Sequence, residues 1–127
     1  MSDCIFCKIV NGEAPCYKIY EDDYTLAFLD IAQKDFGHTL VIPKKHCINT
    51  LDCQDDILQK VILTVKKVAK HYVDNCNFDS VLIMNANNEN AGQVVFHLHY
   101  HIVPKGDKLK RSATMKLDEQ QRILMMC

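Results

Sequence analysis

Three histidines recur at every second position in the segment 96–102, FHLHYHI. Side chains of a β-strand alternate between its two faces, so a strand here would place His97, His99 and His101 on one face. The intervening residues are apolar and suit packing against a helix. A row of three imidazoles suits a core badly, because each ring nitrogen buried without a partner costs about 1–3 kcal/mol. The histidine face is therefore predicted to be a functional site.

Two kinds of chemistry use several imidazoles. A single metal ion held by all three rings is disfavoured, because the outer Cα atoms of such a strand lie about 13 Å apart. Two alternate histidines can chelate an ion, and the third then needs another role. Neutral imidazole is also a nucleophile near pH 7, since its pKa of about 6.5 leaves a ring nitrogen free. A neighbour that holds the Nδ1 hydrogen aims Nε2 outward, and the flanking rings then orient, protonate or supply positive charge.

The strands that would position this segment are indicated by β-branched and alternating apolar runs. They are expected over residues 18–21, 24–29, 38–42, 80–84 and 94–103. The first two would form a hairpin around Asp22-Asp23, and the third and fifth are expected to stop at Pro43 and Pro104. A polar loop over 85–93 joins the last two strands.

One long helix is predicted over 58–72, where apolar residues recur at steps of three and four with lysines on the other face. Asp52 and Asp55 lie at its start, where side-chain acceptors and negative charge are favoured. A short helix is expected over 4–10. These elements predict an α+β fold, an antiparallel sheet of about five strands with one long and one short helix.

The composition is that of one globular domain over residues 1–127, in which the tail 105–127 has no assignable element. Hydrophobic residues make up 48% and the net charge is −1, so no electrostatic footprint for nucleic acid or anionic lipid is expected. No apolar run approaches the roughly 20 residues that span a bilayer. Seven cysteines, an odd number, and no secretory leader favour a cytoplasmic, reducing location.

Cys4-x-x-Cys7 is half of a common zinc pattern, and its alternative interpretation is two small core residues on a short helix. The other cysteines have no ligand-like spacing and are expected to be apolar fillers or surface thiols. They are Cys16, Cys47, Cys53, Cys76 and Cys127.

The segment from His97 to Val103 resembles the His-x-His-x-His-x-x motif of histidine-triad proteins, and the similarity extends from Cys4 to about Pro104. The segments Cys4–Val10 and His38–His46 resemble the Hint branch, the histidine-triad nucleotide-binding proteins. This resemblance implies attack on the α-phosphate of a nucleoside phosphoramidate or related ester, with a transient nucleotidyl-histidine that water cleaves.

Carried over by position, the resemblance implies that His99 is the nucleophile and that His97, His101 and His38 are its catalytic partners. It implies a nucleotide site for a purine nucleotide with a ribose acceptor, polar phosphate contacts and an apolar base pocket. The ribose acceptor would be Asp30, and the phosphate contacts would be Asn85, Gln93 and Val94. The base pocket would be formed by Ile5, Phe6, Ile9, Phe28 and Ile31. Without the resemblance, Asp30 and Asn85 suit turns, Gln93 suits the surface and the apolar residues suit a core.

Some histidine-triad relatives bind zinc through the cysteine pair, the histidine of a Pro-x-x-His segment and the first triad histidine. The resemblance therefore implies a closed zinc site formed by Cys4, Cys7, His46 and His97, which would tie the segment 1–12 to the histidines. Four protein ligands leave no position for water, so such a zinc would be structural.

Other interpretations stay open. They are a dinucleoside polyphosphate hydrolase of the related Fhit branch and a zinc-stabilised nucleotide-binding regulator. Several Hint proteins carry a serine where this chain has Val94, so the preferred leaving group is not implied by the resemblance. Members of the branch pair as homodimers through the long helix and a strand edge, and the apolar stripe over 58–72 permits that pairing.

Overall fold

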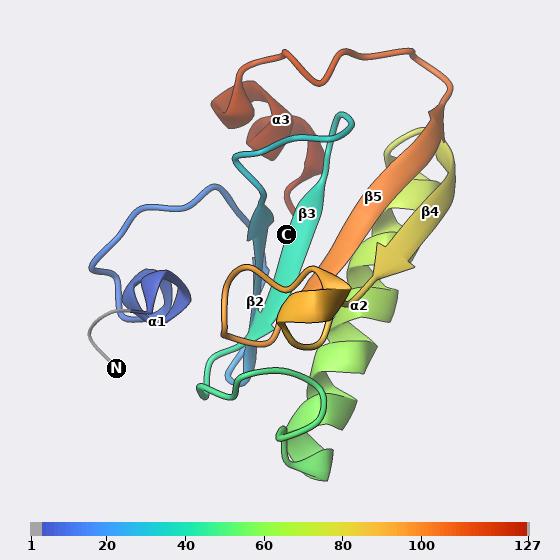
Figure 1. Ribbon diagram of the computed structural model, residues 1–127. Coiled ribbons are helices and arrows are strands. Elements are labelled where there is room, and N and C mark those ends of the chain that lie inside the picture. Colours follow the sequence, from blue (N-terminus) through green and yellow to red (C-terminus); the bar gives the residue numbers. More distant parts are fainter. Residues whose placement is uncertain (1–3, 127) are drawn as a thin grey trace.

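The computed structural model describes residues 4–126 and contains a single antiparallel sheet with helices on both faces (Figure 1). The strands are β1 (Lys18–Glu21), β2 (Thr25–Leu29), β3 (Thr39–Pro43), β4 (Phe78–Met84) and β5 (Tyr100–Asp107), in the order β1-β2-β3-β5-β4. The helices are α1 (Ile5–Val10), α2 (Asp55–Asn75) and α3 (Leu117–Leu124), with a single 3-10 turn, η1 (Glu89–Ala91). The predicted α+β class and its five-stranded antiparallel sheet are confirmed.

Strand alternation divides the apolar residues between the two faces of the sheet. Ala27 and Val41 face helix α2, whose Val65, Val68 and other apolar residues complete the larger core cluster. The alternate residues on the same strands form a smaller cluster with Phe6 of helix α1. Its strand residues are Leu26, Phe28, Leu40 and Ile42. The sheet is therefore covered on both faces, by α2 on one and α1 on the other (Figure 1).

The histidine strand is shifted along the chain from its expected place. It was expected over 94–103, but β5 begins at Tyr100, so His97 and His99 lie in the extended segment before it. It also continues through Pro104, where it was expected to stop. Beyond Ile102, β5 pairs only with β4 in the described sheet. The side on which proline lacks an N–H therefore has no strand to bond.

The chain contains one more helix than expected. The tail 105–127 had no assigned element, but α3 forms there and packs against β1. Its apolar pattern is short and is interrupted by Gln120, which is fully buried in the structure. A buried glutamine in one face of an eight-residue helix hides the 3.6-residue period.

Helix α2 begins later than Asp52, which was expected at its start. The helix runs from Asp55, and Asp52 instead accepts hydrogen bonds from the backbone N–H groups of Ile48 and Asn49 in the preceding loop. Asp55 lies in the first turn, as predicted. Among residues 4–126, no helix combines the length and the apolar character that crossing a membrane requires.

The cysteines outside the Cys4–Cys7 pair divide by burial. Cys53 and Cys76 are buried in the larger core cluster, whereas Cys16 and Cys47 are half-buried. These positions fit the predicted apolar fillers. Cys127 lies outside the described residues.

Candidate active site and adjacent metal cluster

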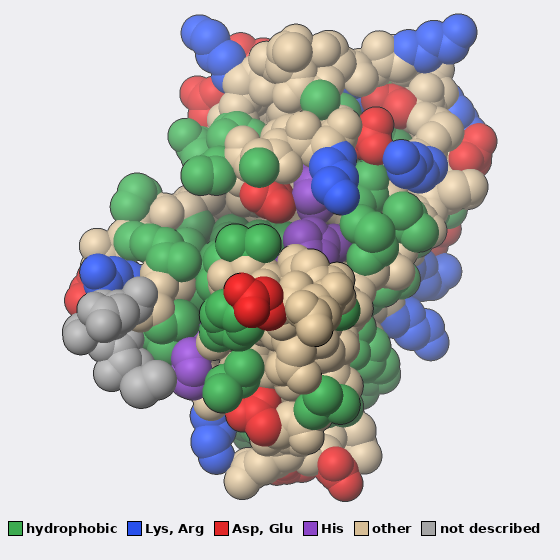
Figure 2. Space-filling view, viewed as in Figure 1, with side chains coloured by type: hydrophobic (Ala, Val, Ile, Leu, Met, Phe, Trp, Pro, Cys, Tyr) green, Lys and Arg blue, Asp and Glu red, His purple; other side chains and the backbone are tan. Residues whose placement is uncertain are grey.

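The histidines gather on the face of the sheet opposite helix α2. His101 on β5 pairs with Leu40 on β3, and Leu40 belongs to the cluster that contains Phe6 of α1. His38 lies two residues before Leu40, so strand alternation directs it to the same face. Histidine atoms reach the surface in the middle of this face (Figure 2). The expected juxtaposition of the histidines is therefore present, although only His101 lies within a strand.

His99 is held in one tautomer and one orientation. Its Nδ1 lies 2.8 Å from the carbonyl oxygen of His97, and since a carbonyl only accepts, Nδ1 carries the hydrogen. The lone pair is therefore on Nε2. The ring of Phe6 meets the His99 ring edge to face, with 5.3 Å between centroids, and Asn85 Nδ2 donates to the His99 carbonyl at 3.0 Å. These contacts leave Nε2 as the nitrogen available for attack.

His38 and His101 form a second ordered pair. The backbone N–H of Lys34 donates to His38 Nδ1 at 3.3 Å, so the hydrogen of the neutral ring lies on Nε2. That nitrogen is 3.0 Å from His101 Nδ1 and donates to it. The neutral His101 ring then carries its own hydrogen on Nε2. Asp30 Oδ2 lies 3.5 Å from His38 Nε2 and completes the cluster.

Burial keeps these two rings neutral. It lowers the pKa of His101 to about 4, and the nearby His99 and His38 act in the same direction. Burial also lowers the pKa of His38, against the opposing effect of the Asp30 carboxylate. At neutral pH these rings therefore orient their neighbours and donate hydrogen bonds. In this structure they do not supply the positive charge that was one of the roles considered for the flanking histidines.

The apolar residues expected around a base are only partly brought together. Phe6 and Phe28 are buried and meet edge to face at 5.5 Å, and Ile9 packs against the same cluster. Ile5 is half exposed on α1. Ile31 is 80% exposed and lies outside this cluster.

The expected polar contacts are already engaged with the protein. Asp30 Oδ1 accepts from the Ala32 N–H at 2.9 Å. Gln93 is buried, with Oε1 bonded to the Asn88 backbone N–H and Nε2 to the Ile48 carbonyl. These bonds hold the loop before the histidines in place. Val94 is 84% exposed beside it.

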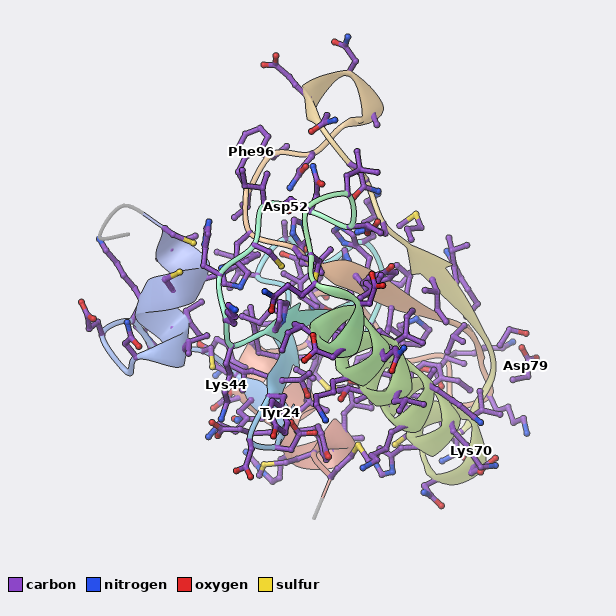
Figure 3. All side chains as sticks on the ribbon, turned by 90° about the horizontal axis from the view of Figure 1, so that it is seen from below. Tyr24, Lys44, Asp52, Lys70, Asp79 and Phe96 are labelled. Atoms are coloured by element: carbon purple, nitrogen blue, oxygen red, sulfur yellow. The ribbon has the colours of Figure 1, made fainter. Side chains whose placement is uncertain are left out.

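Two residues of this network were not predicted from the sequence. Asn49 Nδ2 donates to Gln93 Oε1 at 3.1 Å, and Thr50 Oγ1 donates to Asn85 Oδ1 at 2.7 Å. Both lie in the loop before α2 and hold the polar loop 85–93 against it. No local motif marks them, because their partners are more than 30 residues away along the chain. Phe96, beyond the network, projects outward at the same end of the molecule as Asp52 (Figure 3).

A second cluster, formed by Cys4, Cys7, His46 and His97, lies beside the first. Their ligand atoms all lie within 4.8 Å of one another. His97 Nδ1 is 3.4 Å from Cys4 Sγ, and His46 Nδ1 is 3.3 Å from Cys7 Sγ and 3.2 Å from His97 Nδ1. A tetrahedral zinc with bonds of about 2.0 Å to nitrogen and 2.3 Å to sulfur separates its ligand atoms by about 3.3–3.8 Å. The cluster therefore fits a zinc ion.

The tautomer of His97 also suits a metal. Its Nε2 lies 2.8 Å from the Pro43 carbonyl oxygen, so Nε2 carries the hydrogen and Nδ1 presents its lone pair to the cluster. Two imidazole lone pairs that face each other at 3.2 Å repel unless a cation or a hydrogen lies between them. His97 thus contributes its ring to the metal cluster and its carbonyl to His99.

This sheet, with alternating histidines on the face opposite its long helix, defines a protein of the histidine-triad class. The HIT domain family matches residues 11–108, and the chain belongs to this family. A zinc-bound histidine triad family protein from Mycobacterium smegmatis has a similar structure, with a TM-score of 0.87 and 36% identity over 97% of this chain and 91% of that one.

Two relatives have named activities. An adenosine 5'-monophosphoramidase, hnt1 of Schizosaccharomyces pombe, is 44% identical over 80% of this chain and 74% of its own length. The adenylylsulfatase HINT3 of Arabidopsis thaliana is 35% identical over 99% of this chain and 68% of its own length. The family resemblance inferred from the sequence is thereby confirmed.

The lowered pKa of His101 predicts a pH dependence of stability. The folded pKa of about 4 lies below the ordinary value of 6.5, so the folded protein favours the neutral ring. This contribution is fully present above pH 6.5 and is lost as the pH falls towards 4. The free energy of unfolding of His101→Asn, measured by denaturant titration at stepped pH, should therefore change less steeply across that window. Equal slopes for the variant and the parent would contradict this assignment.

Proposed function

We propose that the protein is a histidine-triad nucleotide hydrolase that cleaves nucleoside phosphoramidates or related purine nucleotide α-phosphate derivatives. The carrying observation is the 2.8 Å contact between His99 Nδ1 and the His97 carbonyl, which leaves Nε2 as a free nucleophile. The named activities of the two relatives both concern adenosine 5'-phosphate derivatives and support the same class of substrate.

In the first step, His99 Nε2 attacks the α-phosphorus. A bond forms between that nitrogen and phosphorus, and the bond from phosphorus to the leaving amine breaks with its electron pair on the amine. The amine needs a proton to leave at neutral pH. That proton comes from solvent, because a neutral imidazole is too weak an acid to release one. His101 carries a hydrogen on Nε2 and is held by His38, so it would orient the leaving amine through a hydrogen bond. The attack leaves His99 cationic, and the His97 carbonyl stabilises that charge through Nδ1–H.

In the second step, water attacks the phosphorus of the nucleotidyl-histidine. A phosphorus–oxygen bond forms, the bond to His99 Nε2 breaks, and the nucleoside monophosphate leaves. The attacking water loses a proton to solvent, which balances the proton that the amine took up in the first step.

Binding of the nucleotide is assigned to the groups around this reaction centre. The Asp30 carboxylate would accept from the ribose hydroxyls, and Phe6 with its apolar neighbours would contact the purine base. Gln93 fixes the loop whose backbone N–H groups at Val94 would face the phosphate. Val94 has no hydroxyl, so the hydrogen bond to the leaving group falls to His101.

Of the two other candidate functions, only the nucleotide-binding regulator is less well supported by the geometry. A regulator that only binds nucleotide does not need a tautomerically fixed pair such as His38 and His101 beside the nucleophile. A dinucleoside polyphosphate hydrolase would use the same attack with a larger leaving group. It differs from the proposed function only in the substrate that is turned over fastest.

Replacing His99 tests the chemistry. His99→Ala is expected to lose at least about a thousandfold in kcat with adenosine 5'-phosphoramidate, because no other group takes the place of Nε2. Intact-mass analysis after acid-free quenching should show a nucleotide adduct on the parent and none on the variant. Calorimetric binding of AMP within about threefold of the parent is the control for an intact site. Parental turnover by the variant would overturn the proposal.

We further propose that Cys4, Cys7, His46 and His97 hold a structural zinc. When bound, zinc would join the N-terminal segment to the histidine segment as a closed site with no open coordination position. The fit of the ligand distances and the zinc-bound relative support this assignment. Zinc thiolates persist where thiols stay reduced, which supports a reducing compartment such as the cytoplasm.

Cysteine replacement tests the metal. The double variant Cys4→Ser, Cys7→Ser is expected to lose stoichiometric zinc, measured by elemental analysis of the purified protein, and to unfold at a lower temperature. Cys16→Ser is the matched control, since Cys16 is half-buried in the same region but outside the cluster. Unchanged zinc content in the double variant would show that the ion lies elsewhere.

We also propose a homodimer that uses helix α2 and the edge strand β4. In the described sheet β4 pairs only with β5, and its Leu82 and Ile83 are both 45% exposed. Ile62 and Leu63 of α2 are exposed as well. Apolar residues exposed on both faces of an edge strand suit coverage by a partner.

A charge on that edge tests the dimer. Leu82→Lys is expected to shift the mass found by sedimentation equilibrium from two chains towards one, because a desolvated lysine opposes association. Leu51→Lys is the control, since Leu51 is 73% exposed in the loop before α2 and belongs to neither element. A parent that sediments as one chain would exclude the pairing.

A further inference from the structure

The C-terminal segment packs against the loop that leads into His38 of the proposed active site. It lies beyond the HIT domain match, which ends at residue 108, yet helix α3 packs beside the loop that joins β2 to β3 (Figure 1). That loop, residues 30–38, ends at His38. The contacts between the two segments concentrate on Phe36 and Gly37, immediately before this histidine.

Gln120 makes the central contact. Its side chain is fully buried, and Oε1 accepts from the Gly37 backbone N–H at 3.0 Å. Its Nε2 donates to the Met115 carbonyl at 2.8 Å, which fixes the direction of the amide. A buried glutamine with all its bonds made inside the protein specifies one arrangement of the two segments.

Two further contacts hold the same stretch of loop. The Arg111 guanidinium lies 4.5 Å from the Phe36 ring centroid and is anchored by two 2.9 Å bonds to the Asp107 carboxylate. At Gly37 the chain has φ of +84°, and a Cβ there would lie 3.1 Å from Leu124 Cδ1. The loop is therefore packed directly onto helix α3.

The helix itself is fixed to the rest of the domain. His71 on α2 donates from Nε2 to the Leu124 carbonyl at 3.0 Å, and the Met126 N–H donates to the Ile19 carbonyl at 2.9 Å. These bonds tie the end of α3 to α2 and β1. The bond to Leu124 also gives His71 a structural role.

We propose that Gln120 is a positioning residue for the histidine-triad reaction, and this rests on the function proposed above. The tautomer of His38 depends on the Lys34 N–H reaching Nδ1 at 3.3 Å across the turn of the loop. Gln120 holds Gly37, and Gly37 sets where that turn ends. Through this contact the tail keeps His38 Nε2 directed at His101 Nδ1.

The test compares Gln120→Met with Gln121→Met. Methionine keeps the length of the side chain and removes its hydrogen bonds. Gln121 is the adjacent residue of α3 and bonds instead to the Lys18 carbonyl on β1. With adenosine 5'-phosphoramidate, Gln120→Met is expected to lose about tenfold in kcat with KM within about twofold, and Gln121→Met to match the parent.

Proton–nitrogen NMR of the imidazole rings supplies a readout that a purely structural role would not change. In the parent, His38 is expected to show a single tautomer with hydrogen on Nε2, and in Gln120→Met a mixture of both. Gln120→Glu retains an acceptor for the Gly37 N–H and should restore the single tautomer at least in part. If Gln120→Met does not fold, Gln120→Glu is the variant to compare with the parent.

Parental kcat together with an unchanged His38 spectrum in Gln120→Met would overturn the proposal. Failure of the proposed function looks different. In that case the parent itself turns over no nucleoside phosphoramidate, while the His38 spectrum still reports whether Gln120 fixes the ring.

Discussion

The hydrogen bond from His99 Nδ1 to the His97 carbonyl is the interaction on which the site depends. One residue serves two centres, since the His97 carbonyl fixes His99, the proposed nucleophile, and the His97 ring faces the sulfur atoms of Cys4 and Cys7. Any displacement of His97 therefore moves His99 as well. A backbone acceptor suits this task, because it has no protonation state of its own and holds the ring at every pH of physiological interest.

The sheet register makes this arrangement possible. Strand alternation sends Val41 into the core under helix α2 and its neighbour Leu40 to the opposite face, where it lies across from His101. The histidines and the larger core cluster thus lie on opposite faces of the same sheet. The core gains its apolar burial without having to accommodate imidazoles, and the imidazoles are ordered by specific hydrogen bonds instead.

Much of the fold was predictable from local sequence. The alternating side chains of β2 and β3 and the 3.6-residue period of α2 are both present in the structure. Each element buries one regular set of side chains, which the sequence pattern reveals. The beginning of β5 was not predictable, since the segment before Tyr100 keeps strand-like alternation without pairing. Helix α3 was missed because its buried face includes Gln120, whose partners at Gly37 and Met115 are set by tertiary contacts. Local patterns cannot report such contacts.

Helix α1 is too short to be stable alone, since six residues make fewer hydrogen bonds than nucleation requires. Its place is set by Phe6, which packs on Phe28 of β2 and against the rings of His97 and His99. Those partners come from distant parts of the chain. Helix α1 is therefore stable only when β2 and the histidine segment are in place, although the ribosome makes it before them.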